Sequence, residues 1–141
     1  MAQNESVSEA DFTAPLRVLV ADDHRDTAQT LGILLRSEGY DVRLAQDGKE
    51  ALSEAAEFQP DVALLDIQMP YRSGLEVADE LRRRGSECPV LIAVTAQTSS
   101  ADRQMAETSG FHHFVAKPYD PQAVLLLLAS LSPENRVTAV A

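Results

Sequence analysis

The stretch Val18-Leu19-Val20-Ala21-Asp22-Asp23 is a short apolar run that ends in two adjacent acids. Three later apolar runs each end in a polar residue in the same way, and these residues are Asp66, Thr95 and Lys117. Because the carboxyl ends of parallel strands meet at one edge of a sheet, we expect the five polar side chains to lie together there. Open α/β folds place their sites at this edge.

The alternation of strand-like and helical segments predicts the fold class. Strand-like runs occupy residues 16–21, 41–45, 62–66, 90–95 and 114–116, and a helical segment follows each of them. Gly39, Gly85 and Gly110 each lie between a helical segment and the next strand, where a helix end favours a positive φ. Repeated β-α units predict one α/β domain with a five-stranded parallel sheet and helices on both faces.

Length and charge limit the domain organisation and the partners. We expect a flexible arm at residues 1–14, one folded domain at 15–132 and a short tail at 133–141. The net charge of −10 argues against nucleic acid as a partner, because a phosphate backbone repels an acidic surface. No apolar run reaches the roughly 20 residues that span a bilayer, and the N-terminus lacks the basic start of a secretory signal. The expected location is the cytoplasm, without membrane contact.

The predicted edge gathers negative charge that needs a cation. Two carboxylates about 4 Å apart repel by roughly 4 kcal/mol at an effective dielectric constant of about 20, and Asp66 adds a third. Oxygen ligands of this kind favour Mg²⁺, with Mn²⁺ as an alternative. Lys117 and Thr95 add a positive charge and a hydroxyl donor, which suit a phosphoryl group. We interpret the paired acids Asp22 and Asp23 as metal holders and the isolated Asp66 as the nucleophile.

Four motifs in this order resemble those of the receiver domain of two-component response regulators. They are Val-Leu-Val-Ala-Asp-Asp at 18–23, Leu-Leu-Asp-Ile-Gln-Met-Pro at 64–70 with Gly74, Ala-Val-Thr-Ala at 93–96 and Lys-Pro at 117–118. The resemblance covers about residues 16–131. It implies a flavodoxin-like receiver fold with strand order 2-1-3-4-5 and a cis peptide between Lys117 and Pro118.

The resemblance also implies a phosphorylation site and its metal ligands. Asp66 would accept a phosphoryl group from a sensor histidine kinase or a histidine phosphotransfer protein. Asp23, Asp66 and the backbone carbonyl of Gln68 would ligate Mg²⁺, with Asp22 acting mainly through water. Lys117 would pair with the phosphoryl oxygens.

Further positions take switching and hydrolysis roles by the same resemblance. Thr95 would close onto the phosphoryl group, and Phe114 holds the position of the family's aromatic switch, which is often tyrosine. Gln68 and Gln97 would flank the path of an attacking water. Glutamine can hydrogen-bond a water but is a poor general base, so the phosphoryl group should be hydrolysed slowly.

The last helical segment carries more apolar residues than one stripe needs. Val124, Leu127, Leu128 and Leu131 suffice for the core. The neighbours Leu125 and Leu126 then either pack under loops or form a contact surface. In the second case, output passes through the fourth predicted helix, the fifth strand and the fifth helix, to an unknown output protein or to a weak homodimer.

Three functions compete at this stage. The first is a stand-alone receiver that signals by protein contact and is not an enzyme beyond its own phosphorylation and dephosphorylation. The second is a Mg²⁺-dependent phosphatase of the haloacid dehalogenase-like class. That class needs Asp-x-Asp, whereas Asp22 is followed two residues later by His24 and Asp23 by Arg25. The third is a phosphate-independent scaffold, which the complete set of site residues disfavours.

Overall fold

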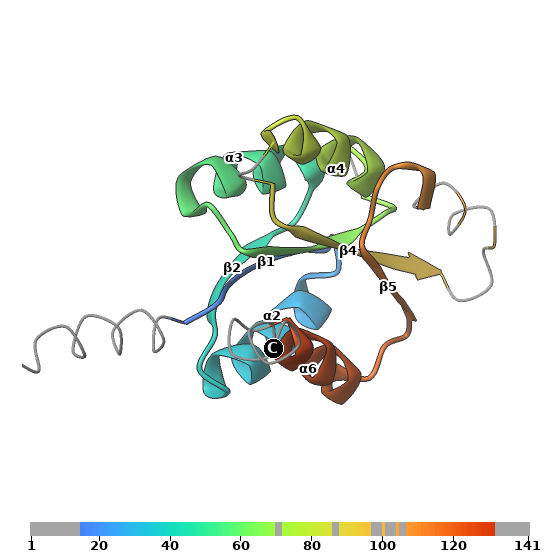
Figure 1. The fold of residues 1–141 in the computed structure, drawn as a ribbon. Coiled ribbons are helices and arrows are strands. Elements are labelled where there is room, and N and C mark those ends of the chain that lie inside the picture. Colours follow the sequence, from blue (N-terminus) through green and yellow to red (C-terminus); the bar gives the residue numbers. More distant parts are fainter. Residues whose placement is uncertain are drawn as a thin grey trace, which may run out of the picture.

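The computed structural model describes residues 15–69, 72–85, 88–96, 100, 104 and 107–131. In these ranges five parallel strands form one sheet in the order β2-β1-β3-β4-β5, which confirms the predicted fold and strand order (Figure 1). The strands are β1 Arg17–Ala21, β2 Asp41–Ala45, β3 Val62–Asp66, β4 Val90–Ala96 and β5 His113–Lys117. Strand β5 is longer than the predicted run at both ends.

The helices cover both faces of this sheet. Figure 1 shows α3 and α4 above the sheet, and α2 and α6 below it. Their bounds are α2 Arg25–Ser37, α3 Gly48–Phe58, α4 Gly74–Arg82 and α6 Pro121–Ser130. Most residues of the helix predicted between the fourth and fifth strands lie outside the described ranges, as do the predicted arm and all but the start of the segment after α6.

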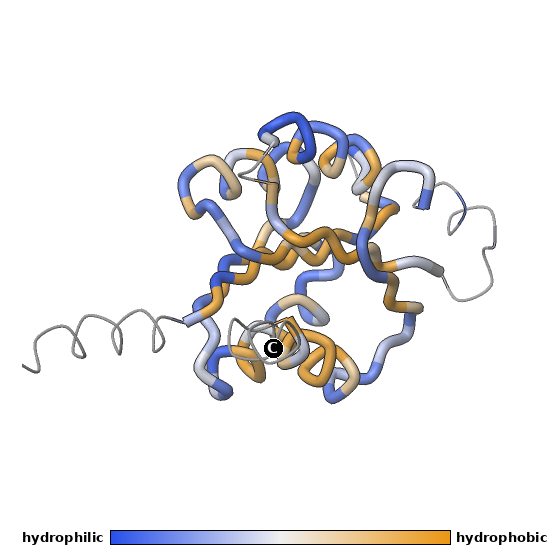
Figure 2. Tube along the Cα trace, viewed as in Figure 1, coloured by the Kyte–Doolittle hydropathy of each residue, from blue (hydrophilic) through white to orange (hydrophobic). Residues whose placement is uncertain are grey.

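Side chains of the central strands alternate between two hydrophobic cores. In β1, Leu19 and Ala21 pack into the core under α3 and α4, whereas Val18 and Val20 pack into the core against α2 and α6. Successive residues of a strand point to opposite faces, so a strand covered on both sides is apolar throughout. Figure 2 shows this hydrophobic band along the middle of the sheet.

Local sequence signals fix the helix ends that frame the edge of the sheet. The three glycines predicted to end helices, Gly39, Gly85 and Gly110, all have positive φ. Helix α4 begins with a capping box, in which the Ser73 side chain accepts from the backbone N–H of Glu76 and the Glu76 side chain accepts from that of Ser73. The glycines mark helix ends, and the capping box sets where α4 starts relative to β3.

Gly74 allows α4 to begin close to the end of β3. Its N–H donates to the carbonyl of Ile67 at 3.0 Å. A Cβ at this position would overlap the carbonyl oxygen of Asp66 and lie 3.0 Å from the Cα of Ile67. Only glycine lets the two backbones approach this closely, which places the first turn of α4 beside Asp66.

Candidate functional site

The carboxyl ends of β1, β3 and β5 bring three acids and a lysine together. Asp22 and Asp66 are buried, with exposed fractions of 2% and 4%, and Asp23 beside them is exposed. The Nζ atom of Lys117 lies 2.7 Å from Oδ2 of Asp66 and 3.4 Å from Oδ1 of Asp22. The strand ends therefore gather the charged residues that the sequence pattern placed at this edge.

The backbone holds the two buried acids in fixed positions. The N–H of Asp22 donates to the carbonyl of Ala45, which continues the β1–β2 ladder by one residue. The N–H of Ile67 donates to the carbonyl of Val94, and this bond likewise continues the β3–β4 ladder beyond Asp66. The N–H of Gln68 donates to Oδ1 of Asp66 at 3.1 Å. Each carboxylate is thus anchored through its own strand.

Burial and neighbouring charges change the pKa values of the central pair. Burial raises the pKa of Asp66, the negative charge of Asp22 raises it further, and Lys117 compensates only in part. Burial alone would lower the pKa of Lys117, but the hydrogen bond and charge of Asp66, together with Asp22, raise it overall. Lys117 is therefore a firmly protonated cation that partly neutralises an unfavourable pair of buried acids.

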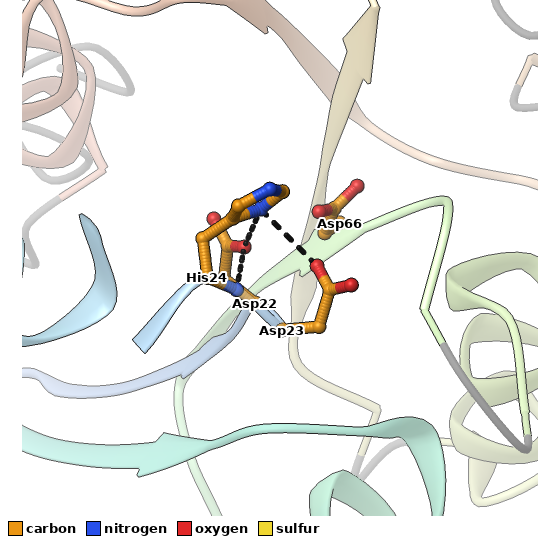
Figure 3. A group of neighbouring side chains, drawn as sticks. All are labelled: Asp22, Asp23, His24 and Asp66. Carbon is orange, nitrogen blue, oxygen red and sulfur yellow. Dashed lines mark hydrogen bonds and ion pairs between the residues drawn. The ribbon is translucent and has the colours of Figure 1, made fainter. Parts of the chain in front are cut away.

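His24 lies in the site, although the sequence analysis gave it no role. Figure 3 shows its ring beside the carboxylates, and its Nδ1 atom is 3.2 Å from Oδ1 of Asp22 and 3.2 Å from Oδ1 of Asp23. The same nitrogen is 3.3 Å from Nζ of Lys117. The signal that could have found it is its position directly after the acid pair, in the turn that leads to α2.

Four of these residues form a group with the donor chemistry of a divalent cation site. Asp22, Asp23, His24 and Asp66 each offer one ligand atom, and these atoms all lie within 4.8 Å of one another. Carboxylate oxygens suit Mg²⁺ and Mn²⁺, and an imidazole nitrogen suits transition metals. The residues present therefore fit a divalent cation.

A cavity of about 680 Å³ opens at this group. Its lining residues are Asp23, His24, Thr27, Asp66, Ile67, Gln68, Val94, Lys117, Pro118 and Tyr119. Gln68, an expected metal and hydrolysis residue, is exposed at this lining. The peptide between Lys117 and Pro118 is cis, as the resemblance implied.

Thr95 and Phe114 are not among the residues that line the cavity. Thr95 is buried at the end of β4, where it pairs with Ala116. Phe114 is half-buried in β5 and packs against the core under α3 and α4. Gln97 lies outside the described residues.

Tyr119 is a second cavity residue that the sequence analysis did not identify. Its hydroxyl is buried and has no hydrogen-bond partner within the described part of the chain. Burial, followed by the charges of Asp22 and Asp66, raises the pKa of Tyr119 to about 12. The ring therefore contributes a neutral hydroxyl behind the acidic cluster.

Comparison with known sequences decides the family. The sequence model described as "Response regulator receiver domain" matches residues 18–129, which include all the acids and the lysine of the site. The chain belongs to this family. As a receiver domain it is part of two-component signalling, and it is separate from the haloacid dehalogenase-like phosphatases considered above.

Individual relatives agree with this assignment. Response regulator MprA of Mycolicibacterium vanbaalenii is 38% identical to this chain over 117 residues. These residues are 83% of this chain and 50% of the relative. The chain spans about half the length of the curated relatives it matches.

None of the described helices has the length and apolar character needed to cross a membrane.

Solved structures show the same fold. The chemotaxis protein CheY4 of Vibrio cholerae matches with a TM-score of 0.76 and 30% identity, over 82% of this chain and 98% of that one. A chain in the co-crystal structure of the Saccharomyces cerevisiae phosphotransfer protein Ypd1 and the receiver domain of Ssk1 matches with a TM-score of 0.77 and 25% identity. That match covers 84% of this receiver domain and 89% of the other chain.

Proposed function

We propose that this receiver domain accepts a phosphoryl group on Asp66 from a histidine kinase or a histidine phosphotransfer protein, in a Mg²⁺-dependent reaction. The observation that carries the proposal is the contact of 2.7 Å between Asp66 and Lys117 at the cavity. One Oδ of Asp66 bonds to phosphorus as the bond from phosphorus to the donor's imidazole nitrogen breaks. The donor nitrogen keeps the electron pair and takes a proton from solvent.

The other residues of the site orient the incoming group. Lys117 turns its ammonium from Asp66 to the phosphoryl oxygens, and Thr95 donates a hydrogen bond to them from β4. Asp23, Asp66 and the carbonyl of Gln68 would hold Mg²⁺, with Mn²⁺ as the alternative, and Asp22 would support it through water. When bound, the ion would supply positive charge that offsets the acids and the phosphoryl oxygens.

A labelling experiment tests the phosphoacceptor. The full chain is incubated with Mg²⁺ and acetyl phosphate or a phosphorylated phosphotransfer protein, and its intact mass is measured. We expect the gain of one phosphoryl group in the wild type, none in Asp66→Asn, and none when EDTA removes the metal. Asp26→Asn, which changes an exposed acid in the first turn of α2, is the matched control and should label normally. Equal labelling of Asp66→Asn and wild type would refute the assignment.

Hydrolysis returns the receiver domain to its resting state. A water oxygen attacks phosphorus, and the bond to Asp66 breaks with the electron pair left on the carboxylate. Gln68 and Gln97 hydrogen-bond this water without serving as strong bases, so the phosphoryl group should be long-lived. Gln68→Ala and Gln97→Ala should each change the decay rate of the phosphorylated mass. An unchanged rate in both variants would remove these residues from the proposal.

We propose that the phosphorylated domain signals by contact with another protein. The contact surface is made by β5, α6 and the helix expected before β5. The supporting observation is Leu126 of α6, which is 74% exposed. Its neighbour Leu125 is half-buried against the core under α2 and α6, so packing accounts for it. Closure of Thr95 onto the phosphoryl group and a turn of the Phe114 ring would carry the signal from the site to this face.

A further inference from the structure

We propose that His24 is a direct metal ligand, and that its nitrogen makes this receiver bind divalent transition metals in preference to Mg²⁺. The proposal rests on the proposed function, because it concerns the same cation site. The oxygen ligands expected from the family resemblance do not include an imidazole. A nitrogen donor in this chain would therefore change which metal the site selects.

The spacing of the ligand atoms supports a shared cation. Nδ1 of His24 lies 3.2 Å from Oδ1 of Asp22 and 3.2 Å from Oδ1 of Asp23. Metal–ligand bonds of roughly 2.1 Å place neighbouring octahedral ligand atoms roughly 3.0 Å apart. The observed separations are close to this value. Figure 3 shows the ring nitrogen directed at the carboxylates of Asp22 and Asp23.

The orientation of the ring places Nδ1 on the side that faces the acids and the lysine. Nδ1 is 3.3 Å from the ammonium of Lys117, and an ammonium only donates hydrogen bonds. The two carboxylate oxygens only accept, so Nδ1 can either carry a proton toward them or accept from Lys117, depending on the tautomer. In the tautomer that accepts, the lone pair of Nδ1 lies near the acids and the lysine. A metal ion in that space would meet the same lone pair.

The backbone keeps His24 at this place without using its ring elsewhere. His24 is the residue before the first turn of α2, and its side chain makes no capping hydrogen bond to the helix. Its N–H donates to Oδ1 of Asp22 at 2.9 Å, which ties the backbone to one of the acids. The side chain is 67% exposed, so the ring can adjust to a bound ion without disturbing the core.

Ligand chemistry then predicts the selectivity. Imidazole suits Zn²⁺, Ni²⁺ and related ions, whereas Mg²⁺ takes oxygen ligands and keeps much of its water. His24→Asn substitutes an oxygen donor at the same position, and asparagine is a favoured residue before a helix. We expect this variant to fold and to change its affinity for Mg²⁺ less than its affinity for Ni²⁺. Its affinity for Ni²⁺ should fall by roughly tenfold or more.

Spectroscopy of bound Mn²⁺ tests the bond itself. The untagged full chain is loaded with Mn²⁺, and electron spin echo modulation is recorded for coupling to a directly bound ¹⁴N. The chain has three histidines, so few side chains can give this signal. We expect the imidazole coupling in the wild type and in His113→Asn, the matched control, and its loss in His24→Asn. Absence of the coupling in the wild type, or its persistence in His24→Asn, overturns the proposal.

Calorimetric titration with Mg²⁺ and Ni²⁺ provides the second arm. A larger fall in affinity for Ni²⁺ than for Mg²⁺ supports nitrogen ligation, and an equal change for both ions, or none for either, overturns it. Labelling of the wild type with Mg²⁺ separates the two proposals. Phosphorylation of Asp66 without nitrogen coupling refutes the role of His24 and leaves the proposed function standing. Nitrogen coupling without any phosphorylation of Asp66 supports the role of His24 and refutes the proposed function.

Discussion

Asp66 holds a charge that folding alone would not favour. It is buried beside Asp22, another buried acid, and the ammonium of Lys117 offsets this arrangement only in part. The site therefore holds an unfavourable interaction between acids, which the proposed cation or phosphoryl group with its cation would relieve. Functional sites commonly reduce stability in this way.

Replacing Asp66 with asparagine should stabilise the metal-free receiver. The pKa of Asp66 in the folded state is raised above its usual 3.8. At pH values between the usual pKa and the folded pKa, the folded state therefore binds more protons than the unfolded state. The stability that the protonated Asp66 carboxyl contributes is fully present at low pH, and it is lost as the pH rises through the folded pKa. We expect Asp66→Asn to raise the free energy of unfolding by about 1 kcal/mol at neutral pH.

Urea unfolding in EDTA measures this effect. The gain should shrink as the pH is lowered toward the ordinary pKa of an aspartate, because the wild-type carboxyl then takes up its proton. Asp26→Asn is the control, since that side chain is exposed in the first turn of α2. A less stable Asp66→Asn variant, or a gain that does not depend on pH, would contradict the assignment of the raised pKa.

Tyr119→Phe should leave stability unchanged or increase it. The buried hydroxyl of Tyr119 has no hydrogen-bond partner within the described residues, and such a group costs about 1–3 kcal/mol to bury. Phenylalanine keeps the ring packing against the core under α2 and α6. The midpoint of urea unfolding measures the change. A loss of more than about 1 kcal/mol would mean that the hydroxyl has a partner in solution.

The sequence predicted the charged residues of the site better than the residues around them. Asp22, Asp66 and Lys117 were found because each comes at the end of an apolar run, and strand ends in a parallel sheet converge. His24 and Tyr119 come one or two residues later, in turns, where strand periodicity no longer determines side-chain direction. Their places depend on the path of the turn, which the sequence pattern does not specify.

At the level of elements, the start of α4 controls the position of Asp66. The N–H of Gly74 bonds to Ile67, and a Cβ at Gly74 would overlap the Asp66 carbonyl. We expect Gly74→Ala to cost about 1–3 kcal/mol of stability, as other overpacked sites do, and to slow phosphorylation by shifting Asp66. Urea unfolding and the rate of mass gain with acetyl phosphate measure the two effects.

Gly32→Ala is the matched control for this prediction. Gly32 is buried in α2, but an added Cβ would meet only the side chain of Leu44, at 3.2 Å, which can move. Alanine is also better than glycine inside a helix by up to about 1 kcal/mol. Stability should therefore stay level or rise, with normal phosphorylation. If both alanine variants behave alike, close approach at Gly74 does not position the site.

Element order was predictable because the β-α alternation leaves few topologies for a parallel sheet. The first and last residues of each strand and helix were less predictable from the sequence. The strand pattern indicated residues 114–116, but β5 includes His113 and Lys117, since backbone pairing with β4 extends beyond the apolar residues. Leu125 looked like surplus surface from its place in the helical stripe, yet it packs against the core between α2 and α6.

At the level of the whole molecule, the acidic site lies at the carboxyl edge of the sheet, and the helices lie on the two faces. Figure 1 shows α2 and α6 side by side on one face of the sheet. Each exposes one large apolar residue: Ile33 of α2 is 68% exposed and Leu126 of α6 is 74% exposed. Each is a single exposed side chain and not a contiguous patch, so neither by itself indicates a contact. The proposed output route through β5 favours Leu126 over Ile33.

Leu126→Glu should therefore weaken a phosphorylation-enhanced association that Ile33→Glu leaves intact. Beryllofluoride, a mimic of the phosphoryl group on Asp66, is added with Mg²⁺, and particle size is followed by light scattering over a range of protein concentrations. We expect the wild type and Ile33→Glu to associate weakly with the mimic and to remain smaller without it, since one short helix offers limited area. Leu126→Glu should stay small in both conditions, because a charge at the centre of the contact must be desolvated. Equal association of Leu126→Glu and wild type would exclude α6 from this contact, and loss of association in Ile33→Glu alone would move the contact to α2.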